Sequence, residues 1–336
     1  MRRGSIVRMV AIGVVVAVLV SLVATLIQWL PTSASEEMDR ITFVYWFATV
    51  ICIAIFALVA AVIVYSVQTF RVQPDDDSDG PPIHGHTGLE IVWTVIPAVL
   101  VIAIGIVSAI VLARNGEAGT NPLKVKVFAQ QFAWRFEYPD QDNLRSGQLY
   151  LPLGRKVRLE LEAADVLHSF WVPDFGQKQD LVPGITTKLV ITPKRIGTYR
   201  LICTELCGLG HATMRSTVHV LTPGEWDTWV QEQQSGTGEG GGAQGAGLFA
   251  SQGCGGCHAF APAGTDAQVG PALDNLAEVA KNAGEDPAAY VKESIVEPNK
   301  VVASGYQAGV MPQNYGQTLS QEQIDALVKY LTESKE

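Results

Sequence analysis

Three long apolar segments fill the first third of the chain: residues 7–30, 43–70 and 89–112. Each is long enough to cross the roughly 30 Å hydrocarbon layer of a bilayer, which takes about 20 residues of helix. Trp46 and Trp93 lie nearer the ends of their segments than the middle, as interfacial aromatic residues tend to. The pattern predicts a transmembrane helical hairpin over residues 41–114, preceded by a further apolar segment over residues 1–34.

That first segment admits two interpretations. It is opened by basic residues: Arg2, Arg3 and Arg8. Residues 32–34 (Thr-Ser-Ala) form a small-residue stretch of the kind that is cleaved after a signal peptide, although the apolar run is long for a signal. A cleaved signal peptide and a first transmembrane helix both stay open. With the arginines in the cytoplasm, either one places everything after Arg114 outside the membrane.

From residue 123 to about residue 220 the pattern changes to short runs that alternate or are rich in Val, Ile and aromatic residues. Such runs, separated by Pro and Gly, are typical of a β-sandwich or a small barrel. We expect strands over residues 123–129, 132–138, 156–161, 186–191, 198–202 and 216–221. Residues 120–234 are therefore predicted to form an all-β domain, which a short helix over residues 226–234 closes.

A glycine-rich stretch follows this domain. Residues 235–245 are rich in Gly and predict a flexible linker. Helical patterns come next, over residues 246–251, 287–295 and 320–332. Ser320 and Gln323 have the spacing of a capping box at the start of the last helix. Residues 246–336 are therefore predicted to form a small helical domain.

Charge excludes one class of partner. The net charge is −9, and residues 236–336 hold five Lys and Arg against twelve Asp and Glu. No segment has the basic character that nucleic-acid binding requires, so we expect no nucleic-acid partner. The lipid bilayer is the partner that the apolar segments predict.

The twelve residues 203–214 carry the most informative chemistry. They include two thiols, an imidazole and a thioether: Cys203, Cys207, His211 and Met214. Soft and nitrogenous donors of this kind favour copper over magnesium or calcium. The site needs one more strong ligand. His168, which lies shortly before a Pro, is favoured over His219, which lies in an alternating strand pattern.

A second redox motif follows in the C-terminal part. Cys254-Gly255-Gly256-Cys257-His258 is the pattern of covalent haem c attachment, in which the thiols bond the vinyl groups and His258 binds the iron. Met311, the only Met after residue 214, would supply the other axial ligand. Two short-loop disulfides are the alternative, which the His near each Cys pair disfavours. A copper centre and a haem in one chain imply electron transfer.

At this point the chain resembles a known family. Residues 89–230 resemble subunit II of haem–copper cytochrome c oxidases: Cys-x-Glu-x-Cys-x-x-x-His-x-x-Met matches at every fixed position, and residues 166–171 resemble the segment with the upstream His. The resemblance implies an all-β cupredoxin-like Greek-key sandwich with a dinuclear copper centre, CuA. Its implied ligands are two bridging thiolates, one imidazole for each copper, a weak thioether and a weak backbone carbonyl: Cys203, Cys207, His168, His211, Met214 and Glu205.

The resemblance implies further roles. The Glu205 side chain would reach a Mg²⁺ ion at the boundary with subunit I. Glu90 opens a segment that resembles the family's second membrane helix, where the matching Glu lies at the entrance of a proton pathway. Phe132 and Trp134 belong to a stretch that resembles the aromatic residues through which electrons enter. Phe132 replaces the first Trp of the mitochondrial pattern, which puts the usual docking point of soluble cytochrome c in doubt.

Residues 244–335 resemble a class I cytochrome c, so an all-α domain is expected there. A subunit II with this fusion is typical of caa3-type oxidases. We therefore predict a proton-translocating oxidase subunit of the bacterial plasma membrane, with its copper and haem domains on the extracytoplasmic side. Electrons would pass from cytochrome c or a cytochrome bc complex to haem c, then to CuA and to subunit I, which reduces O₂ to water. Subunit III is a further expected partner.

Other functions would share parts of this sequence. A CuA and haem c subunit of a nitric oxide reductase would have the same membrane layout, and the identity of its partner would distinguish it. A membrane copper-delivery protein would need only an exposed thiol pair, and the haem motif would be superfluous there. A metal-free subunit of a quinol oxidase would not need the Cys and His set.

Overall fold

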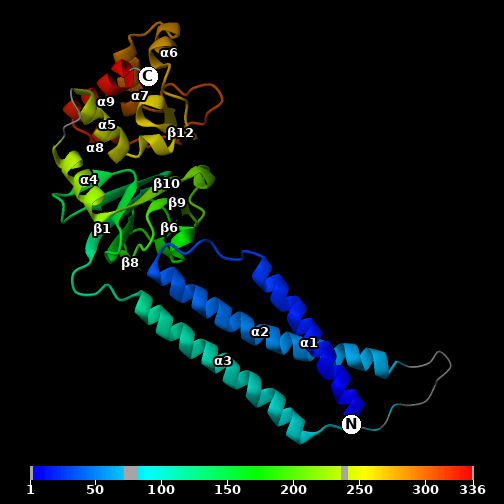
Figure 1. Cartoon of the computed structure of the whole chain (residues 1–336). Coiled ribbons are helices and arrows are strands. Elements are labelled where there is room, and N and C mark those ends of the chain that lie inside the picture. The colour runs from blue at the N-terminus through cyan, green and yellow to red at the C-terminus, as the bar shows by residue number, and fades with distance from the viewer. Residues whose placement is uncertain (1–2, 72–79, 81, 83, 236–240, 335–336) are drawn as a thin grey trace. The chain divides into compact units, whose positions relative to one another are not determined.

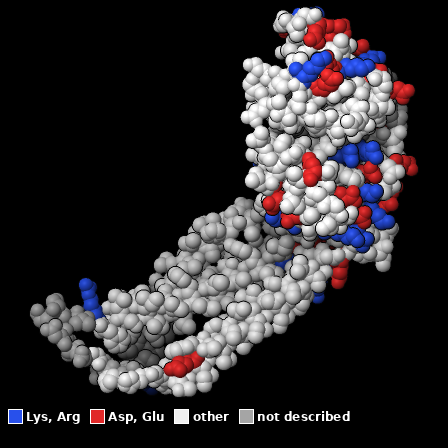
Figure 2. All heavy atoms as spheres, turned by 180° about the vertical axis from the view of Figure 1, so that it is seen from behind, with Lys and Arg blue, Asp and Glu red and all other residues white. Residues whose placement is uncertain are grey.

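The computed structural model describes residues 3–71, 80, 82, 84–235 and 241–334. The chain divides into two compact units: Met1–Thr32 with Asp39–Asn115, and Ser33–Met38 with Gly116–Glu336. Residues 236–240 of the predicted linker lie outside the described residues. Lys, Arg, Asp and Glu gather on the second unit, and the helices of the first unit carry few of them (Figure 2).

The first unit contains three long helices: α1 (Arg3–Leu26), α2 (Glu36–Thr69, whose first turn belongs to the second unit) and α3 (Thr87–Asn115) (Figure 1). All three are long and apolar enough to cross a membrane. Their large apolar side chains are widely exposed, as with Val59 at 48% and Ile102 at 60%, which suits a lipid environment. Pro97 lies inside α3, where a membrane helix tolerates it. The three predicted apolar segments are confirmed as helices.

The second unit begins with a sandwich of two five-stranded sheets, with strand orders β3-β2-β1-β5-β8 and β4-β10-β9-β6-β7 among the described residues. The strands are β1 (Leu123–Gln130), β2 (Ala133–Tyr138), β3 (Leu144–Ser146), β4 (Leu149–Pro152), β5 (Val157–Ala163), β6 (His168–Trp171), β7 (Lys178–Leu181), β8 (Thr187–Ile191), β9 (Gly197–Cys203) and β10 (Arg215–Leu221). Two neighbouring pairs, β1 with β5 and β10 with β4, are parallel. The predicted sandwich is confirmed.

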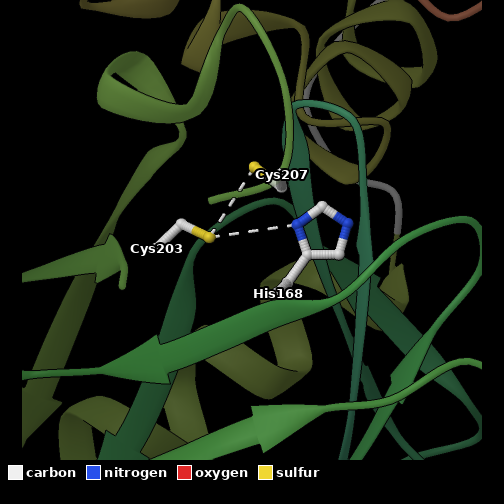
Figure 3. A group of neighbouring side chains, drawn as sticks. All are labelled: His168, Cys203 and Cys207. Carbon is white, nitrogen blue, oxygen red and sulfur yellow. Dashed lines mark hydrogen bonds between the residues drawn. The ribbon is translucent and has the colours of Figure 1, made fainter. Parts of the chain in front are cut away.

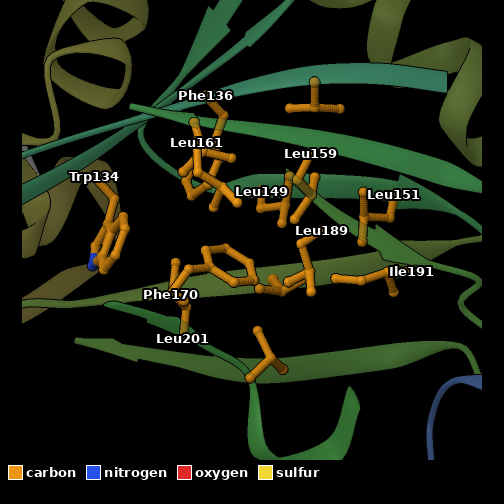
Figure 4. Packing of buried hydrophobic residues seen from close by; sticks show 14 of the residues in the cluster. Trp134, Phe136, Leu149, Leu151, Leu159, Leu161, Phe170, Leu189, Ile191 and Leu201 are labelled. Carbon is orange, nitrogen blue, oxygen red and sulfur yellow. The ribbon is translucent and has the colours of Figure 1, made fainter. Parts of the chain in front are cut away.

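Alternating burial builds the core between the sheets. In β1 every second residue, from Leu123 to Ala129, is buried, because successive side chains of a strand point to opposite faces. Trp134, Phe170 and Leu201 close the same core from the other strands (Figure 4). The six expected strands are present. β3, β4, β6 and β7 were not predicted, because runs of three or four residues are too short to show a period.

The C-terminal part of the unit is mainly helical. Its elements are α4 (Pro223–Ser235), α5 (Gly241–Ser251), β11 (His258–Phe260), β12 (Thr265–Gln268), α6 (Leu276–Asn282), α7 (Pro287–Val296), α8 (Tyr315–Thr318) and α9 (Gln321–Glu333). The predicted helical domain is confirmed, and a short antiparallel pair, β11 and β12, lies within it. The capping box of Ser320 and Gln323 is present.

The predicted linker, residues 235–245, is partly wrong, because α5 already begins at Gly241. Gly245 explains why glycine occurs in a helix here. A side chain on Gly245 would clash with Ala326 and Tyr330 of α9. Glycine therefore allows these two helices to approach closely, and part of the glycine-rich stretch is a packing surface.

Residues Ser33–Met38 are built into the β-sandwich. The Ala34 N–H donates to the Asp174 carbonyl over 2.9 Å, and the Ser35 hydroxyl donates to the Phe175 carbonyl over 3.0 Å. The Glu37 carboxylate is 1% exposed and accepts hydrogen bonds from the amide (2.8 Å) and the hydroxyl (3.0 Å) of Thr192. The first turn of α2 is thus tied to the β-sandwich by buried hydrogen bonds.

Substituting Glu37 tests this attachment. In Glu37→Ala the buried Thr192 amide loses its acceptor, which costs about 1–3 kcal/mol. We expect the Thr192 amide to exchange hydrogen for deuterium at least about fivefold faster in the full chain. Glu36→Ala, an exposed neighbour in the same turn, is the control and should leave the rate unchanged. Equal exchange rates in the two variants would contradict the attachment.

Candidate copper and haem sites

Strand pairing brings the upstream His to the Cys loop. His168 is the first residue of β6, and Cys203 is the last residue of β9. These strands are antiparallel neighbours, with Phe170 opposite Cys203. After β9 the chain makes a loop and a single 3₁₀ turn, His211–Thr213, before β10 begins at Arg215. Segments that are 35 residues apart in sequence therefore meet at one end of a sheet.

The structure brings the predicted copper-binding residues together. The two sulfurs of Cys203 and Cys207 lie 3.9 Å apart. Cys203 Sγ faces His168 Nδ1 (dashed line in Figure 3) at a distance of 3.9 Å, and Cys207 Sγ is 3.6 Å from His211 Nδ1. Cys207 Sγ is also 3.8 Å from Met214 Sδ. Each sulfur therefore faces its own imidazole.

The donor set fits soft metal ions. His168, Cys203 and Cys207 are buried, and their ligand atoms lie within 4.8 Å of one another. The Glu205 carbonyl oxygen is 3.3 Å from Cys203 Sγ, so a weak oxygen donor also faces the pair. All five cysteines of the chain are free. Two thiolates between two imidazoles, with a thioether beside them, suit copper ions that share the sulfurs.

The two thiols have different acidities. Burial raises the pKa of the Cys203 thiol, but hydrogen bonds with the His168 ring and the backbone outweigh it and lower the pKa to about 6. Burial and the neighbouring Cys203 charge raise the pKa of Cys207 to about 12. At neutral pH the metal-free site therefore holds one thiolate and one thiol. Only the thiolate is a strong nucleophile and metal ligand.

Asp165 orients the His168 ring. Its Oδ1 lies 2.8 Å from His168 Nε2 and also accepts a hydrogen bond from the Val166 amide at 2.7 Å. Burial raises the Asp165 pKa, but these hydrogen bonds and one from the Gln131 amide outweigh it and keep the pKa below its usual value. A carboxylate on Nε2 leaves Nδ1 facing Cys203, which is the arrangement of a metal-binding His. Sequence reasoning missed Asp165, although an acid three residues before a candidate ligand is a recognisable signal.

Phe132 packs against the Cys loop, and Trp134 lies near His168. Phe132 is 6% exposed; a side chain on Gly210 would clash with its ring, and one on Gly208 would touch it closely. Trp134 is 2% exposed, and its ring centre lies 6.5 Å from that of His168. Their predicted role in admitting electrons stays a prediction.

The structure also places the haem-attachment residues around one cavity. Its lining includes Cys254, Cys257, His258 and Met311. His258 Nδ1 lies 2.8 Å from the Pro271 carbonyl oxygen, which orients the ring and leaves Nε2 for iron. Gly270 packs against this ring, where a side chain would clash. The apolar lining and the orientation of His258 fit a haem.

Two remaining candidates, Glu90 and His219, are not among the residues that meet around Cys203 and Cys207. Glu90 lies in the first turn of α3, where its carboxylate accepts a hydrogen bond from the His86 amide at 3.2 Å. Its predicted place in a proton pathway stays a prediction. His219, the alternative copper ligand, lies in β10, stacks on Tyr150 and bonds the Gln148 side chain through Nε2. This is the strand role that the sequence favours for it.

Metal removal should expose the pair to oxidation. We expect the copper-free chain to form a Cys203–Cys207 disulfide in air, since the sulfurs are 3.9 Å apart and one is a thiolate. Oxidation should slow as the pH falls through about 6, because protonation removes the Cys203 thiolate. Thiol titration against pH, in a Cys52→Ser background with haem attached, measures this. A rate independent of pH would contradict the assigned acidities.

Comparison with known proteins covers each part of the chain. Family models match residues 24–111 (cytochrome c oxidase subunit II, transmembrane domain), 145–221 (cytochrome c oxidase subunit II, periplasmic domain) and 242–335 (cytochrome c). A cytochrome c oxidase subunit 2 of Alkalihalophilus pseudofirmus is 35% identical over 299 residues, 85% of each chain. Those of Bacillus subtilis (30% identical, 89% of each chain) and Synechocystis sp. (33% identical, 65% of this chain and 82% of the relative) are also similar.

The fold and the site together define a membrane-anchored electron-transfer protein with a copper domain and a cytochrome domain. The chain belongs to the cytochrome c oxidase subunit II family. The relatives named above are cytochrome c oxidase subunits, so they do not favour the alternatives of a nitric oxide reductase subunit or a copper-delivery protein.

Proposed function

We propose that this chain is the electron-accepting subunit of a caa3-type haem–copper oxidase. It takes electrons at haem c and passes them through CuA to subunit I, where O₂ is reduced to water and protons are translocated. One observation carries this proposal: two buried sulfurs each face their own imidazole, in a chain that also has a haem-attachment motif. A delivery protein would need neither the second imidazole nor the haem.

Six residues would hold the copper centre. Cys203 and Cys207 would bridge two copper ions, and His168 and His211 would bind one each. The Met214 thioether and the Glu205 carbonyl would be weak ligands. When bound, a pair of coppers that shares two thiolates accepts and releases one electron with little change in geometry. The chain supports this by burying the sulfurs and by fixing the His168 ring through Asp165.

The cytochrome domain, residues 246–336, would hold haem c. Cys254 and Cys257 would carry it covalently, with His258 and Met311 as axial ligands of the iron. Haem c would supply one-electron chemistry, and the thioether of Met311 would raise its potential. The Pro271 carbonyl fixes the His258 ring, so that the ring would bind iron in one orientation.

Finer roles rest on the family resemblance. The Glu205 carboxylate would bind Mg²⁺ at the boundary with subunit I, Glu90 would open a proton pathway, and Phe132 and Trp134 would admit electrons. Subunit III is a further partner. The donor would be a cytochrome c or a cytochrome bc complex.

The membrane arrangement follows from the ends of the helices. Both Ser33–Met38 and the chain after Asn115 belong to the unit with the copper and haem residues, so α2 begins and α3 ends outside the membrane. We also propose that α1 (Arg3–Leu26) remains as a third span of a bacterial plasma membrane. A side chain on Gly13 of α1 would lie 3.4 Å from Ala61 of α2, so these helices pack closely. The mass of the purified chain distinguishes retention from cleavage near Ala34.

Optical and EPR spectra of the full chain in detergent, loaded with haem and copper, test the proposed function. We expect the absorption of covalent haem c together with the hyperfine pattern of one electron shared by two copper nuclei. A mononuclear copper pattern beside intact haem would overturn the copper assignment. Covalent haem that is absent under conditions where relatives acquire it would overturn the cytochrome assignment.

A further inference from the structure

Gln131 contacts both segments that carry the copper ligands. It lies in the two-residue turn between β1 and β2, which contributes no candidate ligand. Its backbone N–H donates to Asp165 Oδ2 at 2.7 Å. Its side-chain amide Nε2 donates to the carbonyl oxygen of Cys207. One residue therefore holds two loops that are 42 residues apart in the sequence.

Each of these two contacts reaches a residue that binds, or is, a candidate copper ligand. Asp165 bonds His168 Nε2 through its other oxygen, Oδ1, at 2.8 Å. Cys207 supplies one of the two sulfurs, and its carbonyl lies on the same residue. Three hydrogen bonds join the His168 ring to Cys207 through the Asp165 carboxylate and the two amides of Gln131. They run beside the metal site and do not use a metal ion.

The loop is shaped to accept the Gln131 amide. Gly208, directly after Cys207, has a φ of +133°, and a Cβ there would lie 2.7 Å from Gln131 Nε2. Glycine meets both demands, since it adopts this backbone conformation and leaves room for the amide. The close approach of Gly208 thus belongs to the same arrangement as the hydrogen bond to Cys207.

We propose that Gln131 is a positioning residue of the dinuclear copper centre. It fixes the Cys207 sulfur relative to the His168 imidazole, and so determines how evenly one electron is shared between the two copper ions. The inference rests on the proposed function, because it concerns the same centre. Partners of metal ligands commonly contribute tenfold to a hundredfold in affinity or activity, and Gln131 touches partners on both sides.

Two substitutions distinguish the effect of the Gln131 hydrogen bond from the effect of the side chain's size. Gln131→Glu has the same shape and keeps the backbone N–H, but a carboxylate cannot donate to the Cys207 carbonyl and repels it. Gln131→Leu removes the polar group altogether. Gln148→Leu is the matched control, because that amide bonds His219 and not a residue of the copper loops. Each variant is made in the full chain, and the haem absorption reports that the fold is intact.

The readouts are the copper content, the EPR hyperfine pattern and the midpoint potential of the copper centre. We expect both Gln131 variants to share the electron unequally, with a hyperfine pattern closer to that of one copper, a shifted potential and about tenfold slower haem-to-copper transfer. Gln148→Leu should match the unmodified chain. If Gln131→Leu prevents copper binding, the isosteric Gln131→Glu variant decides.

Three outcomes would contradict this account in different ways. If the unmodified chain and both Gln131 variants give the same shared-electron EPR pattern, this inference is overturned and the proposed function stays intact. A mononuclear pattern in the unmodified chain would overturn the proposed function, and the inference with it. A change in Gln148→Leu equal to that in the Gln131 variants would also overturn the inference, since the effect would then not depend on the copper loops.

Discussion

Replacing Cys207 by Ser should leave a single copper ion and stop electron transfer to subunit I. Cys207 Sγ lies within 4 Å of three other donor atoms, on Cys203, His211 and Met214, so its loss removes the centre of the donor set. A hydroxyl is a poor substitute for a thiolate toward copper. We expect a mononuclear EPR pattern and a fall in oxidase turnover of at least about a hundredfold, the upper end for residues that only support a ligand.

Cys52→Ser is the matched control for this substitution. Cys52 is an exposed cysteine in the middle of α2, and it has no donor role in the proposed function. Its spectrum and turnover should equal those of the unmodified oxidase. A Cys207→Ser chain that keeps two coppers per molecule and the shared-electron pattern would show that the second thiolate is not a bridging ligand.

Replacing Met311 by Ala should lower the midpoint potential of haem c. Met311 lines the cavity that also holds His258, and a thioether ligand raises the potential of a haem above that given by other common ligands. Each fall of about 59 mV makes one-electron reduction of haem c by its donor tenfold less favourable, and it makes transfer from haem c to copper tenfold more favourable. We expect the haem to remain covalently attached and to be reduced by a given donor at least about tenfold less completely.

A redox titration of the full chain, followed by haem absorption, measures this change. Met9→Ala, in α1, removes a methionine from the membrane unit and serves as the control, with no change expected. An unchanged haem potential in Met311→Ala would show that another side chain binds the iron, and the axial assignment would then be wrong.

The sequence was sufficient to predict those features that depend on a local pattern of residues. Alternation predicted β1, and apolar length predicted the membrane helices, because burial in a sheet and contact with lipid act residue by residue. Ligand spacing likewise singled out the loop of Cys203 and Cys207. Strand β6 was missed, although it begins with His168, because four residues stabilised by their neighbours β7 and β9 carry no periodic signal of their own.

Long-range contacts escaped prediction for a different reason. Glu37 bonds a residue 155 positions away, and Gln131 bonds one that is 76 positions away. Neither residue has a distinctive neighbour in sequence, so only the folded chain shows what each one touches. The glycine-rich stretch was misjudged because Gly245 has the composition of a linker but serves close packing between α5 and α9.

Electron transfer within one chain tests the central claim most directly. The full chain in detergent, loaded with haem and copper, would be given one electron by a flash-activated donor, with haem and copper absorption followed together. The proposed function predicts that haem c is reduced first, and that it is then reoxidised as copper is reduced, at a rate independent of protein concentration. A haem that stays reduced beside oxidised copper, or a transfer rate proportional to protein concentration, would contradict a chain that passes electrons from its own haem to its own copper centre.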